Sequence, residues 1–441
     1  MARKPAAVQR DTHGVTDKQN EAVLHILLIH QAFAALDEPG GTRHHELARY
    51  LADEGHRVTI IASPVSYLTG KNRPPSIDTG NVGAGSEPAP TKKTISDNVT
   101  ILRAYTYPAL HRSFVHRVFS FVSFMASSFW IGLRVRQVDM VWGTSPPIFQ
   151  GVTAWALARL KRVPFLFEVR DLWPAFAIQV GVLRNPLLVR ASLWLERFLY
   201  RRADRLVVNS PGFIEHVQER GARQVTLIPN GADPRMFNPQ ADGAAFRRVH
   251  GLEGKFMVLY AGAHGMSNDL GVVLEAADRL RERAEIAIVL LGDGKDKPAL
   301  QKRAVELNLP NVHFLASIPK TEMPAALAAA NACLAILKPI PLYATVYPNK
   351  VFDYMAAGRV VILAIDGVMR EVIESAGAGV FVPPGDSAAL AEAIRSLADD
   401  PVRAQAMGMR GRKQVEAHFD RNALAAQLEQ QMQELVGPQH V

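Results

Sequence analysis

The sequence predicts an α/β protein with two domains, each built on a doubly wound parallel sheet. Short apolar runs alternate with helical patterns along most of the chain, and glycine or charged residues directly follow several of these runs. The alternation lapses over residues 234–254 and then begins afresh. A chain of 441 residues is long enough for two domains with separate cores. We therefore predict one domain over residues 21–235, a second over residues 236–418, and a helix in residues 419–441 that returns to the first domain.

The first domain begins with a strand, a glycine loop, a helix and a second strand. The apolar run at residues 23–30 predicts a buried strand, and Gly40 and Gly41 lie in the loop before a helix predicted over residues 42–54. Such a unit brings this loop to the carboxyl edge of a parallel sheet, where glycine lets backbone amides approach a phosphate. The spacing is not GxGxxG, so the dinucleotide-binding fingerprint is absent. Further strands are predicted at residues 57–62, 99–104, 138–142, 165–169, 205–208 and 225–228, and helices over the stretch ending at residue 136 and over residues 186–202.

Two stretches of the first half lack a sustained hydrophobic period. Residues 1–20 are polar and charged and do not resemble a secretory signal, so we expect a disordered leader. Residues 64–99 are rich in Gly, Pro, Ser, Thr and Lys and predict a long, partly disordered loop. Residues 67–73 of this loop are expected to be able to order over a ligand.

Charged residues stand at the carboxyl end of the strand predicted at residues 165–169. Glu168 lies within the run, and Arg170 and Asp171 follow it directly. Charges in this position belong either in a cleft or in an ion pair. The residues alone leave open whether Arg170 and Asp171 pair with each other or take part in catalysis.

The second half alternates strand and helix more regularly, which predicts a second doubly wound parallel sheet. Glycine-containing loops follow two of its strands, and we expect them at one rim because the carboxyl ends of parallel strands share an edge. These loops are residues 262–265, which include Gly262 and His264, and the tripeptide Gly292, Asp293 and Gly294. The predicted strands are residues 256–261, 286–291, 312–315, 332–337, 360–364 and 379–382, and the predicted helices are residues 270–283, 298–307, 323–329, 349–357, 370–375, 387–398, 401–418 and 421–435.

The helix predicted from Asn349 carries a cation and an acid near its start. Asn349 is expected to cap the helix and Gly358 to end it. Unpaired amides at a helix N-terminus attract anions, so Lys350 beside them suits a nucleotide diphosphate. Asp353, one turn further, could accept hydrogen bonds from a ribose diol. The alternative is an ordinary amphipathic helix with a cap and a surface Lys–Asp pair.

The composition is that of a globular protein with a basic first half. Residues 1–240 carry 29 Lys and Arg against 19 Asp and Glu, and the remainder carries 21 against 23. Nucleic acid, an anionic membrane face and a diphosphate-bearing substrate would each account for this excess. The single cysteine, Cys333, lies in an apolar run, which suits a core residue in a reducing compartment.

An aromatic-rich stretch at residues 118–133 is the nearest approach to a membrane segment. It falls short of the roughly 18 uninterrupted apolar residues expected of a membrane span. Arg117 and Arg134 flank it, so it can either lie in a membrane interface or pack in the core. A helix with two faces can do both.

With these residues in place, the chain resembles the family 4 glycosyltransferases of the GT-B fold, which use nucleotide sugars and retain the anomeric configuration. The resemblance covers about residues 23–436. The stretch at residues 167–174 further resembles a subgroup that builds bacterial surface polysaccharides, including N-acetyl-fucosamine transferases of O-antigen synthesis. Four stretches carry the family resemblance through their order and spacing: residues 40–59, residues 228–233, residues 291–294 and residues 348–358.

The resemblance implies a donor site and two departures from the family pattern. It places Gly41 and Lys350 by the diphosphate, Ile318 near the base and Asp353 at the ribose. Thr345 stands where the family has the first glutamate of its Glu-x7-Glu motif, and the usual Arg and Lys fall at Ala263 and Asn268. The full set of implied donor-binding residues is Gly40, Gly41, Gly262, His264, Gly292, Asp293, Gly294, Ile318, Asn349, Lys350 and Asp353.

Transfer from a nucleotide sugar requires stabilisation of the leaving diphosphate and alignment of the acceptor hydroxyl. In the family the leaving phosphate is thought to take the acceptor proton on the same face. We expect no metal or cofactor, because no His, Asp or Cys cluster has ligand spacing. Asp171 and Glu168 are the candidates for orienting the acceptor, and Arg170 is a further candidate for the diphosphate.

The subgroup's acceptors are lipid-linked, so the resemblance implies a lipid-linked glycan acceptor and a cytoplasmic enzyme. Residues 109–136 are then expected to meet the inner membrane peripherally. The alternative function is a nucleotide-sugar epimerase or hydrolase on the same architecture. Nucleic-acid binding is not expected, because the basic residues are dispersed and no nucleic-acid module is recognisable.

Overall fold

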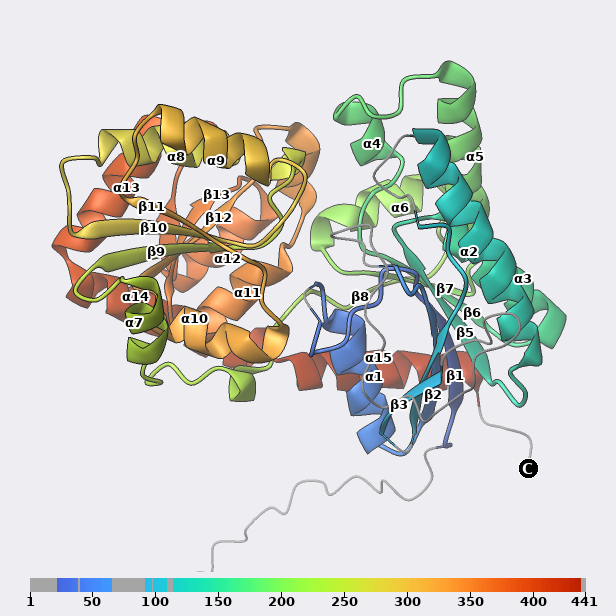
Figure 1. Cartoon of the computed structure of the whole chain (residues 1–441). Helices are drawn as coiled ribbons and strands as arrows, with labels where there is room; N and C mark the ends of the chain where they lie inside the picture. The colour runs from blue at the N-terminus through green and yellow to red at the C-terminus, as the bar shows by residue number, and fades with distance from the viewer. Residues whose placement is uncertain (1–21, 39, 66–91, 97, 109–113, 438–441) are drawn as a thin grey trace, which may run out of the picture.

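The computed structural model describes residues 22–38, 40–65, 92–96, 98–108 and 114–437. Figure 1 shows two α/β domains side by side, each with helices packed on a central sheet. This arrangement confirms the predicted fold class. The predicted leader and residues 67–73 lie outside the described residues.

The first sheet runs in the order β3-β4-β2-β1-β5-β6-β7-β8 within the described chain. Its pairings are parallel except for β3, which runs antiparallel to β4. Strand β3 corrects the expectation of a continuous loop over residues 64–99: an edge strand is held by backbone hydrogen bonds to its neighbour and needs no apolar pattern of its own. The strands are β1 (His25–Ile29), β2 (Arg57–Ala62), β3 (Lys92–Ser96), β4 (Val99–Arg103), β5 (Met140–Ser145), β6 (Phe165–Val169), β7 (Arg205–Val208) and β8 (Val225–Leu227).

Helices cover both faces of this sheet, and the sequence analysis did not predict α3. This helix packs against α2, α5 and β5, so it presents apolar residues in several directions and lacks a clean polar face. The helices of the first domain are α1 (Arg43–Asp53), α2 (Phe114–Arg134), α3 (Phe149–Lys161), α4 (Ala175–Gln179), α5 (Pro186–Arg202) and α6 (Ile214–Glu219).

Successive residues of β1 face two separate hydrophobic cores, as the alternation of side chains along a strand requires. Ile26 and Leu28 pack in the core that contains α1, whereas Leu27 and Ile29 pack in the core that contains α3. All four side chains are fully buried. The sheet is therefore covered on both faces, which explains the continuous apolar runs in the sequence.

The second sheet runs in the order β11-β10-β9-β12-β13-β14, with parallel pairings throughout. Its strands are β9 (Phe256–Ala261), β10 (Ile286–Leu291), β11 (Val312–Leu315), β12 (Ala332–Ile336), β13 (Val360–Ala364) and β14 (Gly379–Phe381). Its helices are α7 (Ala244–His250), α8 (Leu270–Arg279), α9 (Lys297–Glu306), α10 (Met323–Ala329), α11 (Asn349–Ala356), α12 (Val368–Ala376), α13 (Ser387–Asp399) and α14 (Pro401–His418).

The last helix, α15 (Arg421–Val436), returns to the first domain, as predicted. Figure 1 shows it as the red helix that crosses the lower part of that domain. Leu424, Leu428 and Met432 of this helix are buried in the core that also contains α1. The backbone of Ala232 bonds to Phe419 and Arg421 at 3.1 and 2.8 Å, so the two crossings between the domains lie together.

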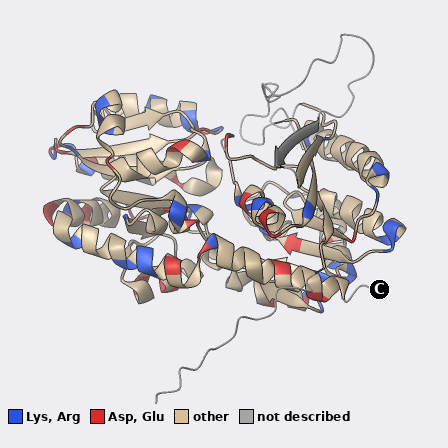
Figure 2. Cartoon of the chain, turned by 90° about the horizontal axis from the view of Figure 1, so that it is seen from below, with Lys and Arg blue, Asp and Glu red and all other residues tan. Residues whose placement is uncertain are grey.

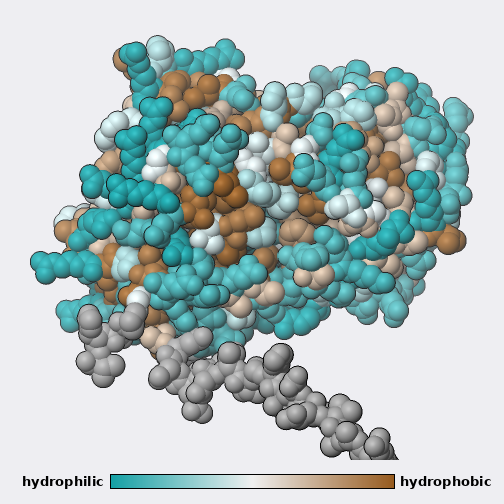
Figure 3. Space-filling model, turned by 180° about the vertical axis from the view of Figure 1, so that it is seen from behind, coloured by the Kyte–Doolittle hydropathy of each residue, from teal (hydrophilic) through white to brown (hydrophobic). Residues whose placement is uncertain are grey.

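Charged residues are distributed over both domains. Figure 2 shows Lys and Arg interspersed with Asp and Glu rather than gathered in one stripe. No helix in the described part of the chain combines the length and apolarity needed to cross a membrane. Figure 3 shows apolar patches on the face of the first domain seen from behind.

Candidate active site

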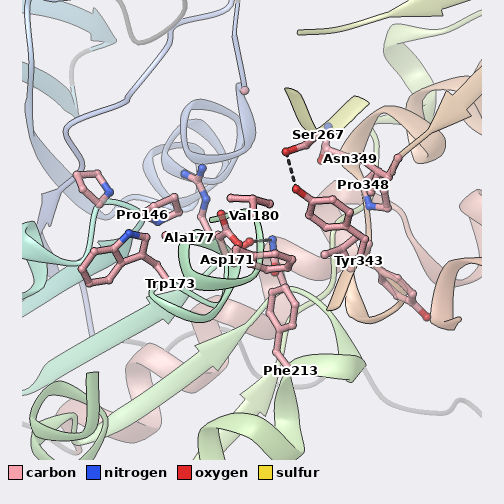
Figure 4. Close-up of a pocket in the computed structure, with 18 of the residues that line it drawn as sticks. Pro146, Asp171, Trp173, Ala177, Val180, Phe213, Ser267, Tyr343, Pro348 and Asn349 are labelled. Carbon is pink, nitrogen blue, oxygen red and sulfur yellow. Dashed lines mark hydrogen bonds between the residues drawn. The ribbon is translucent and has the colours of Figure 1, made fainter. Parts of the chain in front are cut away.

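Two cavities adjoin between the domains and share the lining residues Gly41 and Asn349. The smaller, with a volume of about 300 Å³, lies against the glycine loops of the second domain. The larger, of about 580 Å³, is lined mainly by the first domain and by residues around Tyr343 (Figure 4). Of the predicted donor-binding residues, the smaller cavity brings together Gly40, Gly41, Gly262, Gly292, Asp293, Ile318, Asn349 and Lys350.

The glycines of the smaller cavity allow the loops after β9 and β10 to touch. Gly292 has φ +148°, and a Cβ placed there would lie 1.8 Å from the carbonyl oxygen of Gly262. Gly262 has φ +152°, and its Cβ would lie 2.6 Å from Nζ of Lys350. Side chains at these two positions would therefore displace the lysine or separate the loops.

Lys350 extends along the cavity wall beside an aromatic ring. Its Nζ lies 4.0 Å from the centroid of the Tyr260 ring. Burial lowers the pKa of Lys350 to about 7, because the surrounding protein solvates the ammonium less well than water does. A phosphate beside this nitrogen would restore the charged form.

Asn349 does not cap α11, which corrects the expectation from the sequence. The cap position is occupied by Pro348, and Asn349 is the first helical residue. Its Oδ1 accepts a hydrogen bond of 2.7 Å from Nη2 of Arg421 instead. The side-chain oxygen of Asn349 therefore accepts from Arg421 and not from a backbone N–H of the helix.

Asp353 does not line the smaller cavity, whereas Lys320 does. Oδ2 of Asp353 accepts a hydrogen bond from Nζ of Lys320, and the two side chains are 14% and 9% exposed. Burial raises the pKa of Asp353, and Lys320 opposes that rise. A ribose entering this cavity would therefore meet Lys320 before the carboxylate.

His264 and Gly294 support the loop rather than line the cavity. The backbone N–H of His264 donates to the carbonyl of Asp293 at 2.8 Å, and a Cβ at Gly294 would lie 2.4 Å from the carbonyl oxygen of His264. The imidazole is fully buried, and neither ring nitrogen has a hydrogen-bond partner among the described residues. Burial, together with Lys297, lowers its pKa to about 4, so the ring is neutral.

The larger cavity combines aromatic walls with arginines. Figure 4 shows Asp171 and Trp173 on the first-domain side, opposite Tyr343 and Asn349. Tyr343 bonds through its hydroxyl to Oγ of Ser267 at 2.5 Å. Arginines 43, 117 and 170 line the cavity together with Asp171, the only carboxylic acid among its described lining residues.

Asp171 and Glu168 have different environments although they are three residues apart. Burial raises the pKa of Asp171 to about 7, and Arg170 opposes that rise. Glu168 is fully buried behind the cavity, where its carboxylate contacts Arg43 at 2.9 Å and His44 at 2.7 Å. Glu168 therefore does not face the cavity, in contrast to the expectation that it meets an acceptor.

Several residues that define the two cavities were not predicted from the sequence. Tyr343 and Ser267 carry no sequence signal, because each depends on a contact across the fold. Lys320 follows a strand closely and could have been noticed there. Thr345 lies at the domain contact, where its carbonyl accepts a bond of 2.6 Å from Oγ of Ser210.

Comparison with known proteins agrees with this architecture. The family model described as Glycosyl transferase 4-like domain matches residues 40–231, and that described as Glycosyl transferases group 1 matches residues 255–400. The chain belongs to the family 4 glycosyltransferases. It is thus a retaining enzyme of the GT-B type, as predicted.

Curated relatives of this glycosyltransferase are distant. It is 26% identical over 363 residues to the putative colanic acid biosynthesis glycosyl transferase WcaI of Escherichia coli, covering 79% of this chain and 86% of that protein. It is 25% identical over 272 residues to the probable glycosyltransferase WbjE of Pseudomonas aeruginosa, covering 60% and 68%.

Solved structures share its fold. Sucrose-phosphate synthase from Thermosynechococcus elongatus matches with a TM-score of 0.74 at 21% identity, over 93% of this chain and 99% of that one. Anabaena HepE in complex with UDP and glucose matches with a TM-score of 0.68 at 16% identity, over 93% and 100%.

Proposed function

We propose that this glycosyltransferase moves a sugar from a nucleotide-sugar donor, with retention, onto a lipid-linked glycan in bacterial surface-polysaccharide synthesis. The observation that carries the proposal is the pair of adjoining cavities, because transfer requires a donor and an acceptor to meet at one point. The smaller cavity suits the donor and the larger suits the acceptor.

The donor is proposed to bind with its diphosphate at Lys350 and at the start of α11. Helix amides and a lysine stabilise the negative charge that develops on the leaving diphosphate. A uridine diphosphate sugar is the first choice, since HepE was crystallised with UDP and with UDP-glucose. The relative WcaI, named as a putative colanic acid biosynthesis glycosyl transferase, supports a polysaccharide product. An amino or deoxy sugar such as N-acetyl-fucosamine is the proposed cargo, from the resemblance of residues 167–174.

Asp171, which lines the larger cavity, is proposed to orient the acceptor hydroxyl. The bond from the sugar's C1 to the diphosphate breaks, the bond to the acceptor oxygen forms on the same face, and a phosphate oxygen takes the proton. Asp171 in its ionised form accepts the hydroxyl's hydrogen bond and aligns it.

A thermal-shift panel of nucleotides and nucleotide sugars tests the donor site, since ligand binding raises apparent stability. A shift with uridine or guanosine diphosphate sugars that Lys350→Ala diminishes supports the proposal. Lys295→Ala is the matched control, because Lys295 is exposed beside the same glycine loop. A folded protein that no nucleotide stabilises would exclude the donor assignment.

Product analysis separates transfer from the alternative epimerase or hydrolase. A transferase incubated with donor alone releases free sugar only slowly and leaves the donor's stereochemistry unchanged. Rapid hydrolysis or conversion of the donor to its epimer without any acceptor would contradict transfer.

The first domain is proposed to dock on an anionic membrane face through α2. Phe119, Val122 and Trp130 on this helix are 59%, 51% and 60% exposed, and Arg134 stands at its C-terminal end. Exposed aromatic residues with basic flanks favour the membrane interface. The helix also packs on α3, so the proposed docking would use only its exposed face.

Sedimentation with vesicles that contain phosphatidylglycerol tests this docking. Trp130→Ser should reduce the bound fraction several-fold, because an exposed Trp contributes strongly to interfacial binding. Val305→Ser, a change of an 80% exposed residue in the second domain, is the control. Equal loss in both variants, or binding independent of anionic lipid, would contradict docking through α2.

A further inference from the structure

Arg170 is held at the wall of the larger cavity by two histidines. Its Nη1 lies 3.0 Å from Nε2 of His30 and 3.3 Å from Nδ1 of His44. The two imidazoles lie side by side, with ring centroids 4.2 Å apart. His30 ends up beside Arg170 because it follows β1 directly, and Arg170 follows β6 at the same edge of the sheet.

The protonation of both histidines follows from this contact. A guanidinium is always charged and has only donors, so each facing ring nitrogen must accept. His44 therefore carries its proton on Nε2 and donates to Glu168 at 2.7 Å, and His30 carries its proton on Nδ1 and donates to Oγ1 of Thr144 at 2.7 Å. Burial lowers the pKa of His44 to about 4, which keeps that ring neutral.

Glu168 fixes the tautomer of His44 from behind the cavity. Burial would raise its pKa, but His44, Arg43 and Arg170 outweigh burial and hold the pKa well below its usual range. Arg43 donates a hydrogen bond of 2.9 Å to this carboxylate. Its other two nitrogens donate to the carbonyl oxygens of Pro229 and Ile228, at 2.8 Å each. The carboxylate thereby reaches Arg170 through the hydrogen bonds of His44 and also attracts its charge directly.

Imidazole lone pairs fix the position of a guanidinium without adding negative charge to it. Arg170 therefore lines the cavity as an oriented cation, and Arg117 lines the same cavity. The described walls around these arginines also carry apolar and aromatic side chains, among them Phe121, Phe149 and Trp173. An arginine in a cavity with such walls matches a phosphate group joined to an apolar chain.

We propose that Arg170 forms a phosphate subsite of the larger cavity and that His30, His44 and Glu168 are its positioning residues. The ligand is the phosphate of the acceptor, next to the sugar that is extended, and this assignment rests on the proposed function. Arg170 lines the larger cavity and not the smaller one, which places the donor diphosphate elsewhere.

The test measures binding of decyl diphosphate to the full chain by calorimetry while UDP saturates the donor cavity. The parent protein should bind it, and Arg170→Gln should weaken binding about 10-fold or more through the loss of a charge-assisted contact. His30→Leu should weaken it several-fold, and His30→Gln should restore it, because the amide oxygen can accept from Arg170 in place of Nε2. In the double variant, His30→Leu should cause no further loss beyond Arg170→Gln, since it acts through that residue.

His25→Leu is the matched control. His25 begins β1, the strand that His30 follows, and is also buried. It bonds to the hydroxyl of Thr59 at 2.9 Å, at the opposite end of β1 from the cavities. It should leave decyl diphosphate binding unchanged. An equal loss in His25→Leu and His30→Leu, or additive losses in the double variant, would overturn the positioning role.

UDP binding by itself separates the two proposals. A protein that does not bind UDP contradicts the proposed donor site, whereas one that binds UDP but not decyl diphosphate contradicts only the phosphate subsite. If Arg170→Gln weakens UDP binding and leaves decyl diphosphate binding intact, the phosphate at Arg170 belongs to the donor and the acceptor assignment is wrong. UDP binding that persists in His30→Leu also shows that this variant is folded.

Discussion

The buried ammonium of Lys350 should make donor binding depend on pH above neutrality. The pKa of Lys350 is about 7 in the free protein, because burial disfavours the charged form. A diphosphate beside Nζ favours the charged form, so the pKa rises in the complex and binding takes up a proton. Raising the pH above the free pKa therefore weakens binding until the pKa of the complex is reached.

The size of the effect follows from the protonated fraction of the free protein. That fraction is about one half at pH 7 and about 3% at pH 8.5 for a pKa of about 7. If only the ammonium form pairs with the diphosphate, the affinity for UDP falls about 15-fold across this interval. The last proton of a nucleoside diphosphate is lost near pH 6, as for other phosphate esters, so the ligand itself contributes little.

Calorimetric titration with UDP, in two buffers of different protonation enthalpy, measures both the affinity and the proton uptake. Lys350→Met should bind UDP more weakly and lose the pH dependence. Lys295→Met, which removes an exposed lysine near the same cavity, should keep it. A parent protein that takes up no proton near pH 8, or an unchanged pH slope in Lys350→Met, would refute the reasoning.

Three further predictions concern the acceptor side, the glycine loops and the buried ion pair. Burial raises the pKa of Asp171 to about 7, so kcat/KM for the acceptor should rise as the pH passes through about 7. Asp171→Asn should abolish this rise and lower kcat/KM about 100-fold. A rise that survives in Asp171→Asn would exclude Asp171 as the residue that orients the acceptor. Gly292→Ala should destabilise the fold by about 2–4 kcal/mol in urea unfolding, because the added Cβ overlaps a carbonyl oxygen at a residue with positive φ. Gly271→Ala in α8 adds a Cβ in open space and should stabilise the fold by about 0.5–1 kcal/mol. Similar values for the two variants would contradict the close approach of the loops. Lys320→Met should lower the unfolding free energy by about 3 kcal/mol in the same assay, because it leaves Asp353 buried without its partner. Lys302→Met, which removes an 81% exposed lysine from a surface ion pair, should lower it by less than about 0.5 kcal/mol. A loss below about 1 kcal/mol for Lys320→Met would show that the Lys320–Asp353 pair is well solvated.

Much of the fold could be predicted because strands buried on both faces are apolar throughout. The strand predicted at residues 256–261 coincides with β9, and that at residues 286–291 with β10. Helix α3 and strand β3 were missed for opposite reasons. Helix α3 is covered on several sides and loses its amphipathic pattern, while β3 is an edge strand held by backbone bonds.

The candidate site was predictable only where one short segment supplies the chemistry. The glycine loops at Gly262 and Gly292 and the lysine at position 350 stand in such segments, and they line one cavity. Asn349 and Asp353 were also found locally, but their partners were not. Arg421 and Lys320 lie 72 and 33 residues away along the chain, and no local pattern specifies a contact across that distance.

The sequence by itself determined the alternation of strands and helices, the expectation of two domains, the family, and the loops where glycine is required. These features follow from residue spacing, which acts over a few residues. Only the tertiary structure decided which charges face a cavity. Glu168, Arg170 and Asp171 are near neighbours in sequence, yet Glu168 lies within β6 behind the wall, whereas Arg170 and Asp171 follow the strand and line the cavity. Burial and long-range partners therefore set the role of each charge.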